Sequence, residues 1–121
     1  MAGVRRVLDD ARLAEVLARI DAGDPSRADL KAATWHFLTL LAERAPGASV
    51  EVRVPPFAVV QCIAGARHTR GTPPAVVETD ATTWIALARG TESWSAARAA
   101  GRVRASGERS DLTPLLPLTS H

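Results

Sequence analysis

Residues 53–80 read RVPPFAVVQCIAGARHTRGTPPAVVETD, and this stretch decides the fold of the chain. Two apolar segments with the composition of β-strands, 57–64 and 75–79, flank a loop that is rich in Arg, His, Thr, Gly and Pro. Polar chemistry in a loop held between strands is typical of a binding site. The stretch therefore predicts a sheet that carries a polar loop, and it indicates binding rather than a reaction.

The segments on either side of this stretch show the alternation of half-buried strands. Valines alternate with charged residues over 50–54, and Val103 lies between two arginines. Because successive side chains of a strand point to opposite faces, one set should face a core and the other water. The expected inner residues are Val50, Val52, Val54 and Val103, and the expected outer residues are Glu51, Arg53, Arg102 and Arg104. Residues 57–64 are apolar except for Gln61, which predicts a more buried, central strand.

Residues 7–45 carry the spacing of two helices. Apolar residues recur three or four positions apart, which predicts one buried face on each helix. The expected faces are Val7, Leu8, Ala11, Ala14, Leu17 and Ile20 in the first helix, and Leu30, Thr34, Phe37, Leu38 and Leu41 in the second. Gly23 ends the first helix. The second is capped either by Ser26 with Asp29 or by Asp24 with Pro25.

Further along, Asp80 and Ser93 each precede a short helical segment, a strand begins at Val103, and Asp111 precedes a last helical turn. We therefore expect a single α+β domain over residues 1–121, with a helical hairpin at 7–45 and a sheet with short helices at 48–118. The polar alternation of the strands fits a mostly antiparallel sheet covered by helices on one face. A chain of 121 residues is long enough for one core of ordinary size.

Composition narrows the classes of function. The net charge of +2 comes from scattered arginines, with Lys31 the only lysine, which argues against a nucleic-acid-binding protein. No apolar run approaches the roughly 18 residues of a membrane span, and the N-terminus lacks the apolar segment of a signal peptide. A single cysteine, Cys62, excludes an internal disulfide and agrees with a reducing compartment. We expect a cytoplasmic protein.

Catalytic and metal-binding patterns are weak in this sequence. His36, His68 and His121 share no ligand spacing, so we expect neither a metal nor a cofactor. Cys62 would be a nucleophile only if it were exposed beside positive charge, and within its apolar run it is typical of a small buried hydrophobe. Asp80 is explained as a helix N-cap rather than as half of a carboxylate pair. The sequence therefore predicts a protein that is not an enzyme.

The loop around residues 67–72 is the best candidate for a polar site. Arg67, His68 and Arg70 lie in a glycine-bearing loop with two threonines, a set of donors that can bind a carboxylate or phosphate. The alternative is a solvated loop in which Arg70 pairs with Glu78 or Asp80. Both interpretations stay open.

The large apolar residues are candidates for a ligand-binding lining. These are Trp35, Phe57, Trp84, Leu87 and Trp94. Aromatic side chains at helical spacing can line a lipid-sized cavity, although they more often fill a core. The sequence leaves both roles open.

Four segments carry a family resemblance: RVPPFAVVQC, RHTRGTPP, VVETDATTW and GRVRASGERSDLTPLLPL. With Asp80, Trp84, Leu87, Gly90 and Gly101, they resemble the bacterial sterol carrier protein family, in the actinobacterial branch of the SCP-2-like domains. Where members of this family commonly have Asn after the Pro pair, this chain has Ala75.

The resemblance implies an SCP-2-like sheet of five strands, of which four are recognisable in this sequence. It implies non-catalytic binding of a lipid or another apolar or amphipathic small molecule, without a cofactor, and Arg67, His68 and Arg70 become candidate head-group contacts. The same fold also serves as an accessory domain in some mycothiol-dependent isomerases and acetyltransferases. The alternative function is therefore a partner-binding domain with a filled core that acts with a separate enzyme.

A pocket separates these two hypotheses. One of about 300 Å³ or more, lined by Trp and Val, would favour the carrier. A filled interior with an exposed apolar patch would favour the accessory domain.

Overall fold

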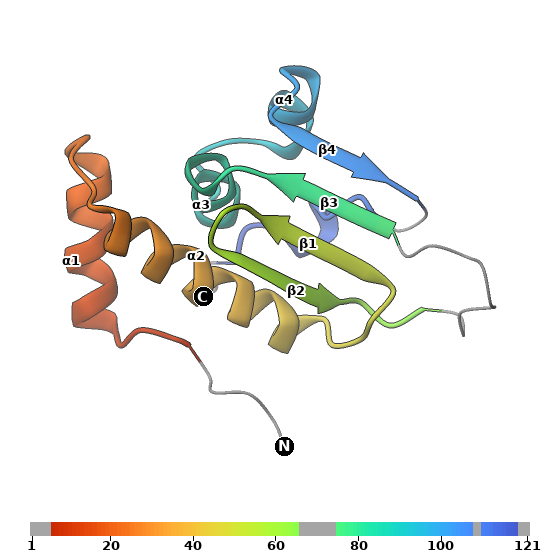
Figure 1. Cartoon of the computed structure of the whole chain (residues 1–121), viewed down its shortest axis with the longest axis horizontal. Helices are drawn as coiled ribbons and strands as arrows, with labels where there is room; N and C mark the ends of the chain where they lie inside the picture. Colours follow the sequence, from red (N-terminus) through yellow and green to blue (C-terminus); the bar gives the residue numbers. More distant parts are fainter. Residues whose placement is uncertain (1–5, 66–74, 108–109, 119–121) are drawn as a thin grey trace.

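The computed structural model describes residues 6–65, 75–107 and 110–118, and Figure 1 shows their arrangement. Two helices, α1 (Asp10–Asp21) and α2 (Arg27–Arg44), precede a sheet of four strands. The strands are β1 (Val50–Val54), β2 (Ala58–Cys62), β3 (Ala75–Thr79) and β4 (Val103–Ser106). Helices α3 (Ala81–Arg89) and α4 (Trp94–Ala99) connect β3 to β4, and a short 3-10 helix, η1 (Thr113–Leu115), follows. The fold is α+β, as expected.

The order of strands in the sheet is β2-β1-β3-β4. Strand β1 pairs with β2, and β3 with β4, in antiparallel fashion, whereas β1 and β3 are parallel. The parallel pair arises because β3 starts at the end of the sheet where β2 finishes and lies on the other side of β1: Val50 is the register partner of both Cys62 and Ala75. The sheet is therefore mostly, but not wholly, antiparallel.

The expectation that residues 57–64 form a central strand is wrong. Strand β2 lies at an edge, and β1 and β3 are the central strands. The apolar residues of β2 lie on both faces of the sheet. Ala58 and Cys62 are buried in the core, while Val59, on the other face, is 52% exposed. A continuous apolar run is typical of a strand covered on both faces, and here only one face is covered by the core.

The predicted alternation of β1 and β4 is confirmed. All four expected inner valines are buried, and Arg53, Arg102 and Arg104 are exposed. Glu51 is half-buried and forms an ion pair with Arg53 on the same face. The outer face of the sheet is therefore polar, and the helices cover the inner one.

Helix α2 begins as one of the two expected caps predicts. The hydroxyl of Ser26 accepts a hydrogen bond from the Asp29 N–H, and the Asp29 carboxylate accepts one from the Ser26 N–H. This reciprocal capping box excludes the alternative cap at Asp24. The face predicted for α1 is partly wrong, because Ala11 and Ala14 are exposed. The predicted Leu17 and Ile20 do pack against the core, together with Leu13 and Val16, which were not predicted.

The core lies between the inner face of the sheet and helices α2, α3 and α4. Phe37 and Leu38 of α2 and Trp84 of α3 are fully buried in it, and the Trp84 indole donates a hydrogen bond to the Thr34 carbonyl. His36 is also buried; its Nδ1 accepts a hydrogen bond from the Leu8 N–H, so it fixes the segment that precedes α1. None of the described helices is long and apolar enough to cross a membrane.

Ion pairs join the first helix to its neighbours. The Arg19 guanidinium makes two hydrogen bonds to Asp29, which hold the pKa of that carboxyl well below its ordinary value of 3.8. Arg89 of α3 binds Asp21 in the same two-pronged way, at 2.8 and 3.1 Å. The C-terminal end of α1 is therefore fixed to the start of α2 and to the end of α3 through charge-assisted bonds.

A matched pair of substitutions tests the two environments of the sheet. Val52→Ala should lower the free energy of unfolding by about 2 kcal/mol, because it removes buried methyl groups and leaves a cavity. Val59→Ala, on the exposed face, should change it by less than about 0.5 kcal/mol. Urea denaturation measures both. Equal losses would contradict the exposure of Val59 on the outer face of β2.

Burial of Cys62 predicts its reactivity. Desolvation raises the pKa of the Cys62 thiol to about 11, so only about one molecule in a thousand carries the reactive thiolate at pH 8. A chromogenic disulfide reagent should label the native protein slowly, and it should rapidly label the protein unfolded in about 6 M guanidinium. Fast labelling of the native state would reopen a role for Cys62 in redox chemistry.

Candidate functional site

Two adjoining grooves lie at one end of the sheet. At this end β1 runs into Pro55, β3 runs into Asp80 and β4 begins after Arg102. Pro55 and Glu78 line both grooves, so the two surfaces are continuous. We call them the aromatic groove and the charged groove.

The aromatic groove has a volume of about 610 Å³ and is built from α2 and the turn between β1 and β2. Helix α2 contributes Trp35, and the turn contributes two prolines and Phe57. Its complete lining is Trp35, Arg53, Pro55, Pro56, Phe57, Ala58, Val59 and Glu78. Most of this surface is apolar, and the two charged residues lie on the outer face of the sheet.

Cations cover the aromatic rings of this groove. The Arg6 guanidinium lies 4.2 Å from the ring centroid of Trp35, and the Arg27 guanidinium lies 5.0 Å from that of Phe57. The indole N–H of Trp35 is buried and has no hydrogen-bond acceptor among the described residues. Such a donor is costly to leave unpaired, so an acceptor that reached it would be bound favourably.

A third, smaller groove of about 300 Å³ begins on the other side of Trp35. It is lined by Arg6, Val7, Leu8, Ala28, Lys31, Ala32 and Trp35. Trp35 therefore lines two apolar surfaces, one with Arg53 in its lining and the other with Arg6 and Lys31.

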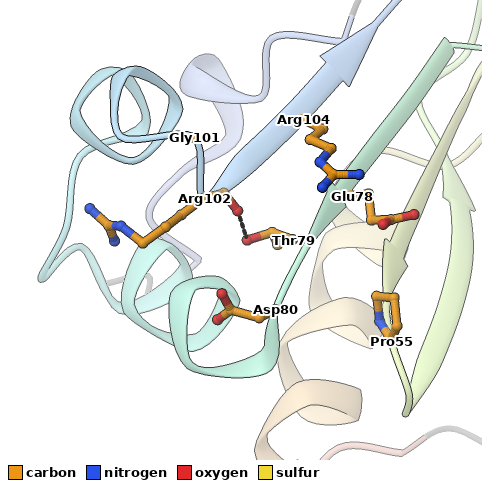
Figure 2. Close-up of a pocket in the computed structure, with 7 residues that line it drawn as sticks. All are labelled: Pro55, Glu78, Thr79, Asp80, Gly101, Arg102 and Arg104. Carbon is orange, nitrogen blue, oxygen red and sulfur yellow. Dashed lines mark hydrogen bonds between the residues drawn. The ribbon is translucent and has the colours of Figure 1, made fainter.

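The charged groove has a volume of about 340 Å³. Figure 2 shows its lining: Pro55, Glu78, Thr79, Asp80, Gly101, Arg102 and Arg104. The Thr79 hydroxyl donates a 2.8 Å hydrogen bond to the Arg102 carbonyl and joins the end of β3 to the start of β4. The groove thus contains two carboxylates and two guanidinium groups.

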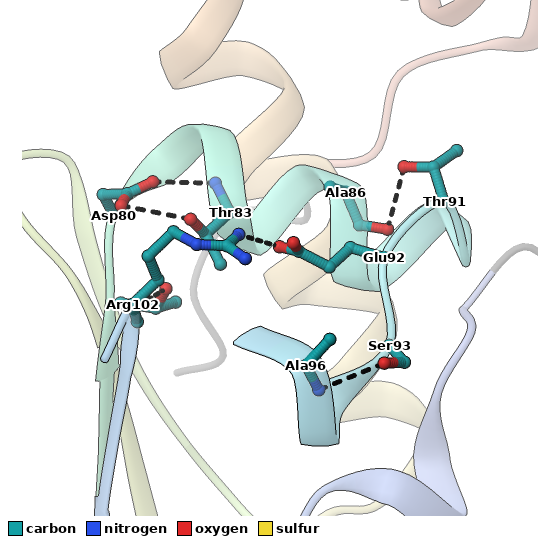
Figure 3. A network of polar contacts seen from close by, with 9 residues as sticks. Asp80, Thr83, Ala86, Thr91, Glu92, Ser93, Ala96 and Arg102 are labelled. Carbon is teal, nitrogen blue, oxygen red and sulfur yellow. Dashed lines mark hydrogen bonds and ion pairs between the residues drawn. The ribbon is translucent and has the colours of Figure 1, made fainter. Parts of the chain in front are cut away.

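Two of these four charges are already engaged, as Figure 3 shows. Asp80 caps α3, because its carboxylate accepts hydrogen bonds from the N–H and hydroxyl of Thr83 at 2.7 and 3.1 Å. The Arg102 guanidinium forms an ion pair with Glu92. Glu78 and Arg104 form no ion pair with any other residue in the described part of the chain. Within the described part of the chain, they are the charged groups of this groove that remain available to a ligand.

The structure brings two of the five predicted apolar residues together. Trp35 and Phe57 both line the aromatic groove. Trp84, Leu87 and Trp94 are buried in the core and line none of the three grooves described above. The predicted polar residues Arg67, His68 and Arg70 lie outside the described residues.

The sequence interpretation missed several residues of the grooves. Val59 was missed because it lies in a continuous apolar run, which is typical of a strand in the core. A strand with one buried face needs an apolar residue only at every second position, and this run has more. Glu78 and Arg104 were identified as outer or loop-pairing residues, and only the strand order places them side by side. Pairs of register positions on one face are the signal that would have found them.

The described residues limit the chemistry of this end of the molecule. Among residues 6–65, 75–107 and 110–118, no group of three or more His, Cys, Asp or Glu is arranged to hold a metal ion. The grooves offer apolar surface, aromatic rings and single charges, which are the components of a site for an amphipathic molecule.

Comparison with known proteins gives a family for this chain. No curated protein matches the sequence. A family model described as "Bacterial SCP ortholog" matches residues 26–118, from the N-cap of α2 to the end of the last described segment. The chain therefore belongs to this family of bacterial sterol carrier protein-like domains.

Proposed function

We propose that the protein is a non-catalytic carrier of a lipid or another apolar or amphipathic small molecule, and that the aromatic groove binds it. The observation that carries this proposal is a groove of about 610 Å³ lined by Trp35, Phe57 and Val59. This volume falls within the roughly 300–1,000 Å³ of small-molecule sites. Membership of a sterol carrier protein-like family supports a carrier role.

The driving force for binding would be burial of apolar surface. Phe57 is half-buried and Val59 is 52% exposed, so both can lose contact with water when a ligand binds. Each Å² of apolar surface removed from water contributes about 25 cal/mol. The three predicted residues in the core have a different role: Trp84, Leu87 and Trp94 are buried in the core and do not line the groove.

A cytoplasmic carrier without a cofactor remains part of this proposal. Burial of Cys62 removes one candidate nucleophile from solvent. The family match supports binding rather than catalysis.

Substitutions in the aromatic groove test the carrier function. Phe57→Ala should weaken binding of a fluorescent fatty acid, cis-parinaric acid, by roughly eightfold, because a ligand would no longer cover on the order of 50 Å² of ring surface, worth about 1.2 kcal/mol. Val59→Ser should also weaken binding. Because Val59 is exposed, this substitution should not destabilise the fold. Leu115→Ala is the matched control, because Leu115 is a half-buried apolar residue of η1 that does not line the groove. It should leave binding unchanged. A wild-type protein that binds no such probe would overturn the proposal for fatty acids.

Ligand binding by the polar loop stays a prediction, and the fold limits which ligands could contact both the loop and the groove. Gly65 and Ala75, the described residues that flank the loop, lie at the end of the sheet opposite the grooves, since β2 ends and β3 starts there. Five strand residues span about 17 Å. A ligand in the aromatic groove therefore reaches Gly65 and Ala75 only if it is long.

Arg67→Ala and Arg70→Ala should accordingly weaken binding of an octadecenoic acid probe by roughly tenfold, because a hydrogen bond between charged groups is worth about 1.5–3 kcal/mol. The melting temperature should hardly change. Binding of decanoic acid, which is too short to cross the sheet, should be unaffected. Unchanged binding of both acids, with a loss of stability in Arg70→Ala, would favour the solvated loop.

A second candidate function is a partner-binding accessory domain. The filled interior around Trp84 and the half-exposed Val59 on an edge strand favour it. Native mass spectrometry of the protein purified from its own host separates the two functions. A bound small molecule supports the carrier, whereas a stoichiometric protein partner without a small molecule supports the accessory domain.

A further inference from the structure

A row of alternating charge crosses the outer face of the sheet beside the aromatic groove. In the strand register Arg53 of β1 is the partner of Glu78 of β3, and Glu78 is the partner of Arg104 of β4. On the other side of Arg53 the partner is Val59 of β2. From the edge strand β2 across to the edge strand β4, the row therefore runs apolar, positive, negative, positive.

The two arginines of this row are not equivalent. The Nε of Arg53 donates to the Glu51 carboxylate, so its charge is partly neutralised. Glu78 and Arg104 have each other as cross-strand neighbours and no ion pair among the described residues. Figure 2 shows both side chains in the charged groove, and no ion pair joins them. Attraction between partly exposed groups is weak, so a ligand can replace it at little cost.

The position of Glu78 links this charge pair to the proposed carrier site. Glu78 and Pro55 line both grooves, so a molecule whose apolar part lies against Phe57 has its polar end beside Glu78. The Glu78 carboxylate disfavours a simple anion there, and the Arg104 guanidinium disfavours a simple cation. A head group with one charge of each sign satisfies both residues.

We propose that the charged groove binds a zwitterionic head group, with its cationic part at Glu78 and its anionic part at Arg104. This inference rests on the proposed carrier function and specifies the class of ligand. The head group can belong to a phosphate-containing lipid or to a carboxylate-containing zwitterion, because the charge pattern is the same in both.

Ligands with one chain length and different head groups test this proposal. Isothermal titration calorimetry of the wild-type protein compares dodecylphosphocholine and dodecyl betaine with laurate and dodecyltrimethylammonium, all below their micelle concentrations. At least one zwitterion should bind about three- to fivefold more tightly than either singly charged ligand, as expected for partly exposed ion pairs. The tighter of the two zwitterions identifies phosphate or carboxylate as the anionic part.

Charge-removing variants assign the preference to the two residues. Glu78→Gln should abolish the advantage of the zwitterion over laurate, and Arg104→Gln should abolish its advantage over the trimethylammonium ligand. Arg98→Gln, an exposed arginine of α4 that lines neither groove, is the matched control and should keep both preferences. Circular dichroism verifies that the variants are folded.

The outcomes separate this inference from the carrier function. Equal binding of all four ligands, or a preference that survives both substitutions, would overturn the zwitterion site and leave the carrier function standing. Binding of none of the four to the wild-type protein would overturn both.

Discussion

The two-residue period of the strands is the constraint on which the rest of the molecule depends. Val52 and Val77 are register partners on the inner face, and both are buried between the sheet and the helices. Once these valines face inward, the residues next to them along each strand must face outward. Arg53 and Glu78 are therefore placed side by side in the open by the same register that builds the core. The charge row of the outer face and the apolar layer of the inner face are two results of one pairing.

Helix α2 connects this sheet to the candidate site. Its buried side, with Phe37 and Leu38, packs into the core, while Trp35 on its flank forms a wall of two grooves. His36, between them, holds the backbone of Leu8. Residues that differ by one or two positions along this helix thus serve the core, the groove and the N-terminal segment. The tight packing of its buried side fixes the position of the half-buried Trp35 ring.

Local rules explain what could be predicted from the sequence. The alternation around Val52, the capping box of Ser26 and Asp29, and the cap at Asp80 depend on neighbours within a few residues, and all three are present in the structure. The edge position of β2 could not be predicted, because an apolar run has the same composition whether its second face meets a core or a groove. The parallel pairing of β1 with β3 depends on how the chain returns after β2.

Not all residues of the candidate site could be predicted, for the same reason, because they come together only in the tertiary structure. Trp35 and Phe57 were recognised as possible lining residues, but Trp84, Leu87 and Trp94 looked no different from them in sequence and lie in the core. Glu78 and Arg104 are 26 residues apart (residue 78 to residue 104) and become neighbours only through the pairing of β3 with β4. Periodicity shows which face a residue occupies, and only topology shows what lies next to it.

The filled core has a consequence for the way in which a ligand enters and leaves. A carrier that encloses its cargo between helices and sheet must open its interior for each exchange, and the rate then follows the free energy of that opening. Here Trp84 and Phe37 occupy the interior, and the aromatic groove lies outside them. Under the proposed carrier function, cargo in such a groove would exchange without breaking any core contact. Loading is then limited by the strength of the surface contacts themselves, and the empty protein is as well packed as the loaded one.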